Sequence, residues 1–255
     1  MIKNIDRAYC ISCVKRILGK KGSVLLENPI TIEELSIEKD LYYKNHKILT
    51  YNIKYPLFSS SHFQLILEQL NLYYRTKALM YEEKDVMNLF QMAKVQYEYL
   101  VSNGFPVNRY EIYVSYEVTL NHNCALSIYF DKYEYAGGAH GLTSRESDTW
   151  DLKRSKMIYL RNLFPCGLDY SQCIKENIKK QISQIRREES YWFFDDYQEL
   201  VDKNLKEKSF YLSPEGLIIY FQQYDIAPYA SGIPTFLIPY GTCGVKVPSC
   251  KSSSR

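Results

Sequence analysis

The sequence lacks any apolar run long enough to cross a membrane. Its longest runs, residues 217–221 and 236–238, have the length of strands and fall far below the roughly 20 residues of a spanning helix. Residues 10–18 are interrupted by polar and basic side chains, so they lack the apolar centre of a signal peptide. The sequence as written therefore predicts a cytoplasmic protein with no membrane span.

Catalytic motifs are missing as well. The sequence contains no GxSxG elbow, no Walker loop, no GxGxxG fingerprint and no HExxH pair. It has only four histidines, and none has a recognisable base or metal partner nearby in the sequence. We therefore predict a protein that is not an enzyme and needs no cofactor, with a small hydrolase centred on His140 as the weakest alternative.

A strong net charge is also absent. The 32 basic and 29 acidic side chains leave a net charge of +3. Residues 1–21 hold six of the basic groups and residues 246–255 hold three, which leaves the body with 23 basic and 28 acidic groups. Because nucleic-acid binding needs a basic face on the folded part, we expect no nucleic-acid partner.

The seven cysteines are an odd number spread through a long chain, which is typical of reduced thiols rather than of a disulfide scaffold. Cys10 and Cys13 form the one CxxC pair. A structural zinc site usually needs two such pairs, and the sequence has no second one. The sequence therefore predicts no metal, with Cys10 and Cys13 as the weak candidates for metal or redox chemistry.

Tyrosine is the abundant residue, at 25 positions. Codon bias of an AT-rich genome explains such a number without any function. The alternative is a binding surface, because tyrosine combines a large apolar ring with a polar tip and is enriched at interfaces. In the segment 109–135, Tyr113, Tyr129, Tyr133 and Tyr135 fall on the polar side of a strong apolar–polar alternation.

Hydrophobic periodicity predicts an α+β fold with antiparallel sheets. The sheets are packed by a long N-terminal helical segment and a second amphipathic helix. The segments that we expect are a hairpin over 37–57, helix over 63–100 in one piece or two, strands over 109–135 and through Trp150, a helix over 169–189, and strands over 210–221 and 235–240.

The one dense glycine cluster lies between two predicted strands, at Gly137, Gly138 and Gly141, and it contains His140. Glycine permits positive φ and close approach of the backbone, so the loop suits an anion held by its amides. A bulged strand connection held together by the imidazole explains the same residues without a ligand. Both alternatives stay open.

Two separate segments resemble signatures of the RsiV/PdaC-like domain family. They are residues 133–141, YEYAGGAHG, and residues 210–221, FYLSPEGLIIYF. The resemblance extends over about residues 37–241. It implies an α+β domain similar to the extracellular part of a lysozyme-sensing anti-sigma factor and to the non-catalytic module of a peptidoglycan deacetylase. A C-terminal subdomain shaped like one in the heat-shock ATPases is implied too.

The sequence departs from both relatives in the parts that surround this domain. The sensing members have a transmembrane helix, and the deacetylase domain has two aspartates followed by Gly-Pro together with an HxxxH pair. Here Asp195 and Asp196 are followed by Tyr197 and Gln198, and no such histidine pair exists. The resemblance therefore implies a binding domain without the catalytic one.

The expected organisation is a basic extension (1–36), an N-terminal half (37–135), a C-terminal half (136–243) and a flexible tail (244–255). We expect a non-catalytic protein of the cell envelope of a Gram-positive bacterium that recognises lysozyme or a cell-wall glycan. The alternative is an intracellular or spore-associated protein that retains the fold without wall binding. The candidate residues for ligand or partner binding are Tyr133, Tyr135, Gly137, Gly138, His140 and Gly141.

Overall fold

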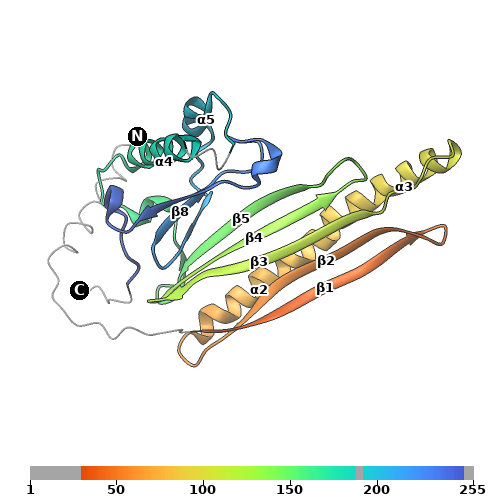
Figure 1. The fold of residues 1–255 in the computed structure, drawn as a ribbon. Coiled ribbons are helices and arrows are strands. Elements are labelled where there is room, and N and C mark those ends of the chain that lie inside the picture. Colours follow the sequence, from red (N-terminus) through yellow and green to blue (C-terminus); the bar gives the residue numbers. More distant parts are fainter. Residues whose placement is uncertain (1–29, 188–191, 250–255) are drawn as a thin grey trace, which may run out of the picture. The chain divides into compact units, whose positions relative to one another are not determined.

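The computed structural model describes residues 30–187 and 192–249, which form a mixed α+β structure (Figure 1). The chain divides into two compact units. The long-helix unit holds residues 30–118 and 129–146, and the C-terminal unit holds residues 119–128 and the described residues from 147 onward. The division falls within strands β3, β4 and β5. The α+β prediction is confirmed.

Six strands form the larger sheet, in the order β1-β2-β3-β4-β5-β6. Their bounds are β1 (Thr31–Tyr43), β2 (His46–Ser59), β3 (Tyr110–His122), β4 (Ala125–Tyr135), β5 (Leu142–Asp151) and β6 (Lys156–Met157). β1 and β2 form the predicted hairpin, although Pro56 lies within β2 rather than ending it. The prediction of purely antiparallel sheets is wrong for one pair, because β2 and β3 run parallel. A helical crossover joins these two strands, and such a connection returns the chain in the same direction.

One continuous helical run of 39 residues makes this crossover: α2 (Gln64–Met80), the π-helical turn η1 (Tyr81–Val86) and α3 (Met87–Ser102). It packs along β2 in Figure 1. Its buried side is an apolar stripe, which comprises Ile66, Leu67, Leu70, Tyr74, Ala78, Val86, Leu89, Ala93 and Tyr97. The charged residues that interrupt the stripe in the sequence fall on η1.

The C-terminal unit has a core of its own. Helices α4 (Tyr170–Arg187) and α5 (Tyr197–Asn204) accompany an antiparallel sheet of β7 (Phe210–Leu212), β8 (Gly216–Tyr220) and β9 (Thr235–Pro239). Ile174, Ile178 and Ile182 of α4 are fully buried, as their helical spacing predicts. The 3-10 turns η2 (Leu160–Leu163), η3 (Tyr229–Ser231) and η4 (Thr242–Gly244) complete the unit.

The prediction of seven reduced thiols is wrong for three cysteines of this unit. Cys173 at the start of α4 forms a disulfide with Cys243 in η4, with 5.7 Å between their Cα atoms. Cys124 is disulfide-bonded as well. Cys173 and Cys243 are 70 residues apart, so only the packing of η4 beside α4 reveals their pairing. Cys10 and Cys13 lie outside the described residues.

The chain stays packed beyond η4. Val245, within the range predicted as a flexible tail, is 3% exposed. The next residue, Lys246, donates its backbone N–H to the Leu163 carbonyl at 2.8 Å and its ammonium to the Phe164 carbonyl at 2.7 Å. These contacts and the disulfide fix the segment 242–246 to the C-terminal unit.

Candidate binding surface

The sheet of the long-helix unit has one side covered by the helix and one side away from it. On β4, Phe130 stacks on Tyr74 of α2, with 5.3 Å between ring centroids. Lys132 donates to Asp85 of η1 at 2.9 Å. Because neighbouring side chains on a strand point to opposite sides, the odd-numbered residues of β4 lie on the side away from the helix.

That side carries the tyrosines singled out from the sequence. Tyr133 of β4 stacks on Tyr113 of β3 with 6.3 Å between ring centroids and 23° between ring planes. Tyr129 and Tyr135 lie on the same side of β4, and Tyr113 is 38% exposed. We name Tyr113, Tyr129, Tyr133 and Tyr135 the tyrosine face. It is a surface of rings on paired strands, which hold their positions better than a loop does.

Charged groups hold one end of the tyrosine face in place. Arg145 of β5 donates two hydrogen bonds to the Asp131 carboxylate, at 2.7 and 2.6 Å, and its guanidinium lies 3.8 Å from the centroid of the Tyr129 ring. The Tyr129 hydroxyl donates to Glu117. Burial and this hydrogen bond raise the pKa of Tyr129, so its hydroxyl remains protonated in ordinary buffers.

The glycine loop lies directly beside the tyrosine face, and Gly141 is its tightest point. A Cβ atom on Gly141 would lie 2.4 Å from two atoms of the Tyr133 ring and 2.6 Å from the Glu134 carbonyl oxygen. The missing side chain therefore provides the space over which the Tyr133 ring lies. Of the two properties that favour glycine in this loop, positive φ and close approach of the backbone, Gly141 shows the second.

The other candidate residues meet at the same loop. Tyr135 donates its hydroxyl to the Gly138 carbonyl at 2.9 Å, and Asn108 donates its side-chain amide to the Gly137 carbonyl at 3.0 Å. Gly137 has a φ of +79°, which explains a glycine at this position. Exposed His140 places its Nδ1 3.1 Å from the carbonyl oxygen of Gly141. The structure thus brings all six candidates together, and their role in binding remains a prediction.

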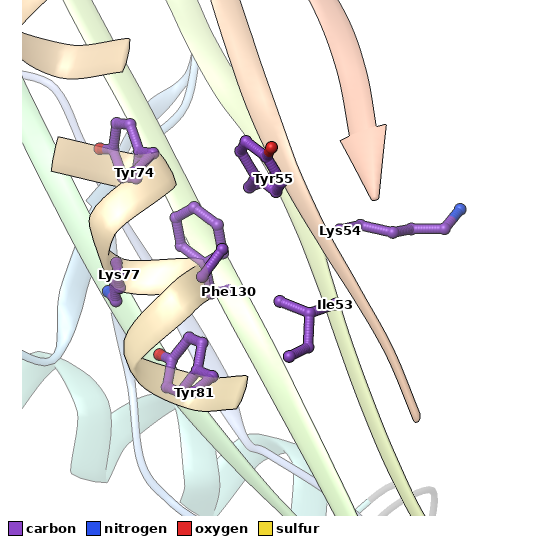
Figure 2. A pocket seen from close by; sticks show the side chains of 8 residues that line it. Ile53, Lys54, Tyr55, Tyr74, Lys77, Tyr81 and Phe130 are labelled. Carbon is purple, nitrogen blue, oxygen red and sulfur yellow. The ribbon is translucent and has the colours of Figure 1, made fainter. Parts of the chain in front are cut away.

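A shallow hollow of about 160 Å³ lies on the helix-covered side of the same unit. Figure 2 shows Tyr74, Lys77 and Tyr81 along α2 and the start of η1, near Phe130 of the sheet. Lys77 is already bound, because its ammonium lies 2.8 Å from Glu146 and 4.9 Å from the Phe130 ring centroid. Ligand pockets measure roughly 300–1,000 Å³. Part of this 160 Å³ is open solvent, and the hollow encloses no room for such a ligand. The tyrosine face is therefore the better candidate.

The π-helical turn η1 adds a polar anchor between helix and sheet. Glu82 accepts hydrogen bonds from Lys39 of β1, at 2.8 Å, and from the hydroxyl of Tyr51 on β2. These two bonds lower the pKa of the Glu82 carboxyl below its usual value. A carboxyl with a lowered pKa stabilises the fold above about pH 4.5, and this stabilisation is lost as the pH falls through the folded-state pKa.

We expect Glu82→Gln to lower the free energy of unfolding by about 1 kcal/mol at pH 7, because the amide cannot replace a charge-assisted acceptor. Near pH 3 the difference from the wild type should shrink, since the wild-type carboxyl is then increasingly protonated. Urea unfolding at both pH values measures the two differences. Glu33→Gln, at an exposed position of β1, is the control and should change little at either pH. An equal loss at both pH values would contradict the role of the charge.

Some members of the surface were not found by sequence reasoning. Arg145, Asp131 and Glu117 were not selected, although the alternation that selected the tyrosines places Asp131 and Glu117 on the same side. Their partnership depends on which residues of neighbouring strands lie opposite each other. The paired acids Asp195 and Asp196 are exposed in a turn just before α5.

Residues 30–187 and 192–249 hold neither a metal-ligand cluster nor a membrane-spanning helix. Among these residues no three His, Cys, Asp or Glu side chains gather as ligands of a metal ion would. None of the helices that the structure describes is both long enough and apolar enough to span a bilayer.

Comparison with known proteins matches two family models to different parts of the chain. Residues 43–143 match the model described as Deacetylase PdaC, and residues 161–241 match the model described as Protein of unknown function (DUF3298). The first covers the long helix and the glycine loop, and the second covers most of the C-terminal unit. Both segments that carried the resemblance in the sequence lie within or overlap these ranges.

Two curated relatives from Bacillus subtilis are similar to the chain. It is 32% identical to the anti-sigma-V factor RsiV over 107 residues, which are 40% of this chain and 37% of RsiV. It is 22% identical to the peptidoglycan-N-acetylmuramic acid deacetylase PdaC over 176 residues, which are 66% of this chain and 34% of PdaC. The matched regions thus span little more than a third of each relative's length.

Two crystal structures of DUF3298 family members share the fold. One, from Bacteroides fragilis, superposes with a TM-score of 0.62 at 21% identity, over 84% of this chain and 92% of that one. The other, from Pseudomonas aeruginosa, gives a TM-score of 0.60 at 18% identity, over 86% and 95% of the two chains. At these identities the similarity establishes the fold alone.

Proposed function

The chain belongs to the RsiV/PdaC-like domain family, and on this premise we propose that it is a non-catalytic binding domain whose tyrosine face recognises a cationic protein. The observation that carries the proposal is the tyrosine face itself. Stacked rings on paired strands, bordered by carboxylates, offer a wide flat surface of the kind that suits a folded protein.

Charge supports a cationic partner. The long-helix unit carries 14 acidic and 11 basic side chains, a net charge of −3. Glu117 and Asp131 lie at the tyrosine face, and Arg145 is the basic group paired there with Asp131. Opposite charge mainly accelerates association, so a partner with a basic surface would associate with this side faster than a neutral partner would. Lysozyme is the cationic protein that the family resemblance suggests, and we use it as the probe.

The Cys173–Cys243 disulfide supports an oxidising compartment for this domain, because cytosolic thiols are generally kept reduced. We therefore place the binding role outside the cytoplasm, which differs from the cytoplasmic location expected from the apolar runs alone. Lysozyme and peptidoglycan both occur there. The proposed location and the proposed partner are thus consistent with each other.

We expect Tyr113→Ala to raise the Kd for a c-type lysozyme at least tenfold, because a central tyrosine at an interface commonly contributes 2 kcal/mol or more. Tyr133→Ala should raise the Kd by a similar factor, since the two rings stack on each other. Biolayer interferometry on the purified full chain measures both. Tyr159→Ala is the matched control: Tyr159 is 45% exposed, and it belongs to the C-terminal unit and not to the tyrosine face.

The same assay separates the proposed partner from a glycan. Raising NaCl from about 50 to about 500 mM should slow association with lysozyme while leaving dissociation nearly unchanged. Binding of soluble peptidoglycan fragments in place of lysozyme would overturn the protein partner. Lysozyme binding that survives both tyrosine substitutions would overturn the tyrosine face as its site, and no binding of either probe would overturn the proposed function.

A further inference from the structure

The outer side of the long helix is unexpectedly apolar. Its inner side packs on the sheet, yet large apolar side chains are also exposed along the opposite side. We name these residues the outer stripe: Leu65, Leu72, Leu79, Met80, Met87, Met92, Val95 and Tyr99. Leu65, Leu72 and Val95 are 79%, 67% and 73% exposed, so nothing in the described chain covers them.

The spacing of the outer stripe is that of a helix-pairing surface. Leu65, Leu72 and Leu79 are seven residues apart, and Met92 and Tyr99 repeat the same interval. A seven-residue apolar repeat keeps side chains facing a second helix over several turns. Single exposed apolar residues need no explanation, but an apolar row along a helix roughly 58 Å long indicates a contact surface.

We propose that the outer stripe is the interface of a symmetric homodimer, in which the long helices of two copies pair antiparallel about a two-fold axis between Glu83 and Lys84. In such an interface, residues equally far before and after the axis meet across it. Leu72 then faces the partner's Val95, and Met80 faces the partner's Met87. All four are exposed residues of the outer stripe.

Charge selects this register. Glu83 of each copy meets Lys84 of the other, so two opposite-charge pairs form at the axis. Both residues are exposed, and among the residues that the structure describes neither has an ion-pair partner. Exposed Glu68 and Arg75 meet the partner's Tyr99 and Met92, so the register brings no exposed like charges together. Glu82 and the partner's Asp85 are also equally far from the axis, but each is bonded to a lysine of the sheet in its own copy. A parallel pairing in register would place Glu83 against Glu83, which like-charge repulsion disfavours.

The proposed dimer leaves the tyrosine face open. The outer stripe lies on the side of the helix away from the sheet, and the tyrosine face lies on the side of the sheet away from the helix. Self-association and partner binding therefore use different surfaces of the long-helix unit. The dimer would present two tyrosine faces and bind a clustered partner more strongly than one copy does.

Charge reversal tests the register with the full chain. Sedimentation velocity over a range of micromolar concentrations should show a dimer for the wild type. Glu83→Lys should raise the dimer Kd about tenfold or more, because lysine then faces lysine at both pairs. Lys84→Glu should do the same. The double variant Glu83→Lys/Lys84→Glu should restore the wild-type Kd to within about threefold, since both pairs are again of opposite charge.

Two further variants complete the test. Leu72→Glu should abolish the dimer while the circular dichroism spectrum is preserved, because the side chain is exposed in one copy. Lys203→Glu on α5, an exposed charge of the C-terminal unit, is the control and should leave the Kd unchanged. A wild type that stays monomeric up to about 100 µM overturns the proposal. A double variant whose dimer Kd is no lower than that of the single variants overturns it as well.

Discussion

Replacing Cys173 and Cys243 together with serine is expected to lower the free energy of unfolding of the C-terminal unit by about 2–5 kcal/mol. The disulfide closes a loop of 70 residues, so its loss gives the unfolded chain more conformational freedom. In the folded state it ties η4 to the first turn of α4, and buried Val245 directly follows η4. Urea unfolding of the wild type and the double variant, without reductant, measures the difference.

Cys166→Ser is the matched control for this loss. Cys166 is exposed in the same unit, and its replacement should change the free energy of unfolding by less than about 0.5 kcal/mol. Peptide mapping under non-reducing conditions should recover the fragments of Cys173 and Cys243 linked to each other. Recovery of both residues as thiols from oxidised protein would contradict the pairing and would also remove the support for an oxidising compartment.

Gly141→Ala is expected to cost about 1–3 kcal/mol of stability and to weaken binding through the tyrosine face. The new methyl group would lie 2.4 Å from the Tyr133 ring and 2.6 Å from the Glu134 carbonyl oxygen. The ring must turn away, and it then loses its stack on Tyr113. Thermal unfolding measures the first effect, and the lysozyme assay measures the second.

Gly138→Ala provides the control within the same loop. A Cβ atom on Gly138 would meet nothing within 4 Å, and the φ of Gly138 is not in the positive range. The substitution should therefore change the melting temperature little. Equal melting temperatures of the two variants would show that the Gly141 contact does not control the loop. If the Gly141→Ala variant is destabilised but binds lysozyme normally, the packing of the loop does not control binding through the tyrosine face.

Local patterns in the sequence predicted most of the elements, because their periodicity is set by neighbours along the chain. Ile174, Ile178 and Ile182 of α4 recur every four residues, and all three are fully buried. The alternation across β3 and β4 placed Tyr113 and Tyr133 on one side, and the stack between them confirms it. The glycine loop was also located correctly, because few other residues adopt positive φ or permit such close approach.

Neither the direction of β3 nor the outer stripe followed from periodicity. The residue pattern of a strand is the same whether its neighbour runs parallel or antiparallel. The parallel pairing of β2 and β3 is therefore revealed only by the path of the long helix. That helix is apolar on two sides, and the sequence does not show which side the sheet will cover. Burial of Tyr74 and exposure of Leu72 settle the choice.

By itself the sequence determined the α+β class, the long helix, the strands with their tyrosine-rich side and the family resemblance, because all of these are written in short-range patterns. The tertiary structure alone decided the Cys173–Cys243 disulfide, the pairing of Arg145 with Asp131 and the fit of Tyr133 over Gly141. Each of these joins groups on separate elements. The physical reason is that such contacts depend on strand register and helix packing, which the whole chain fixes and no local segment encodes.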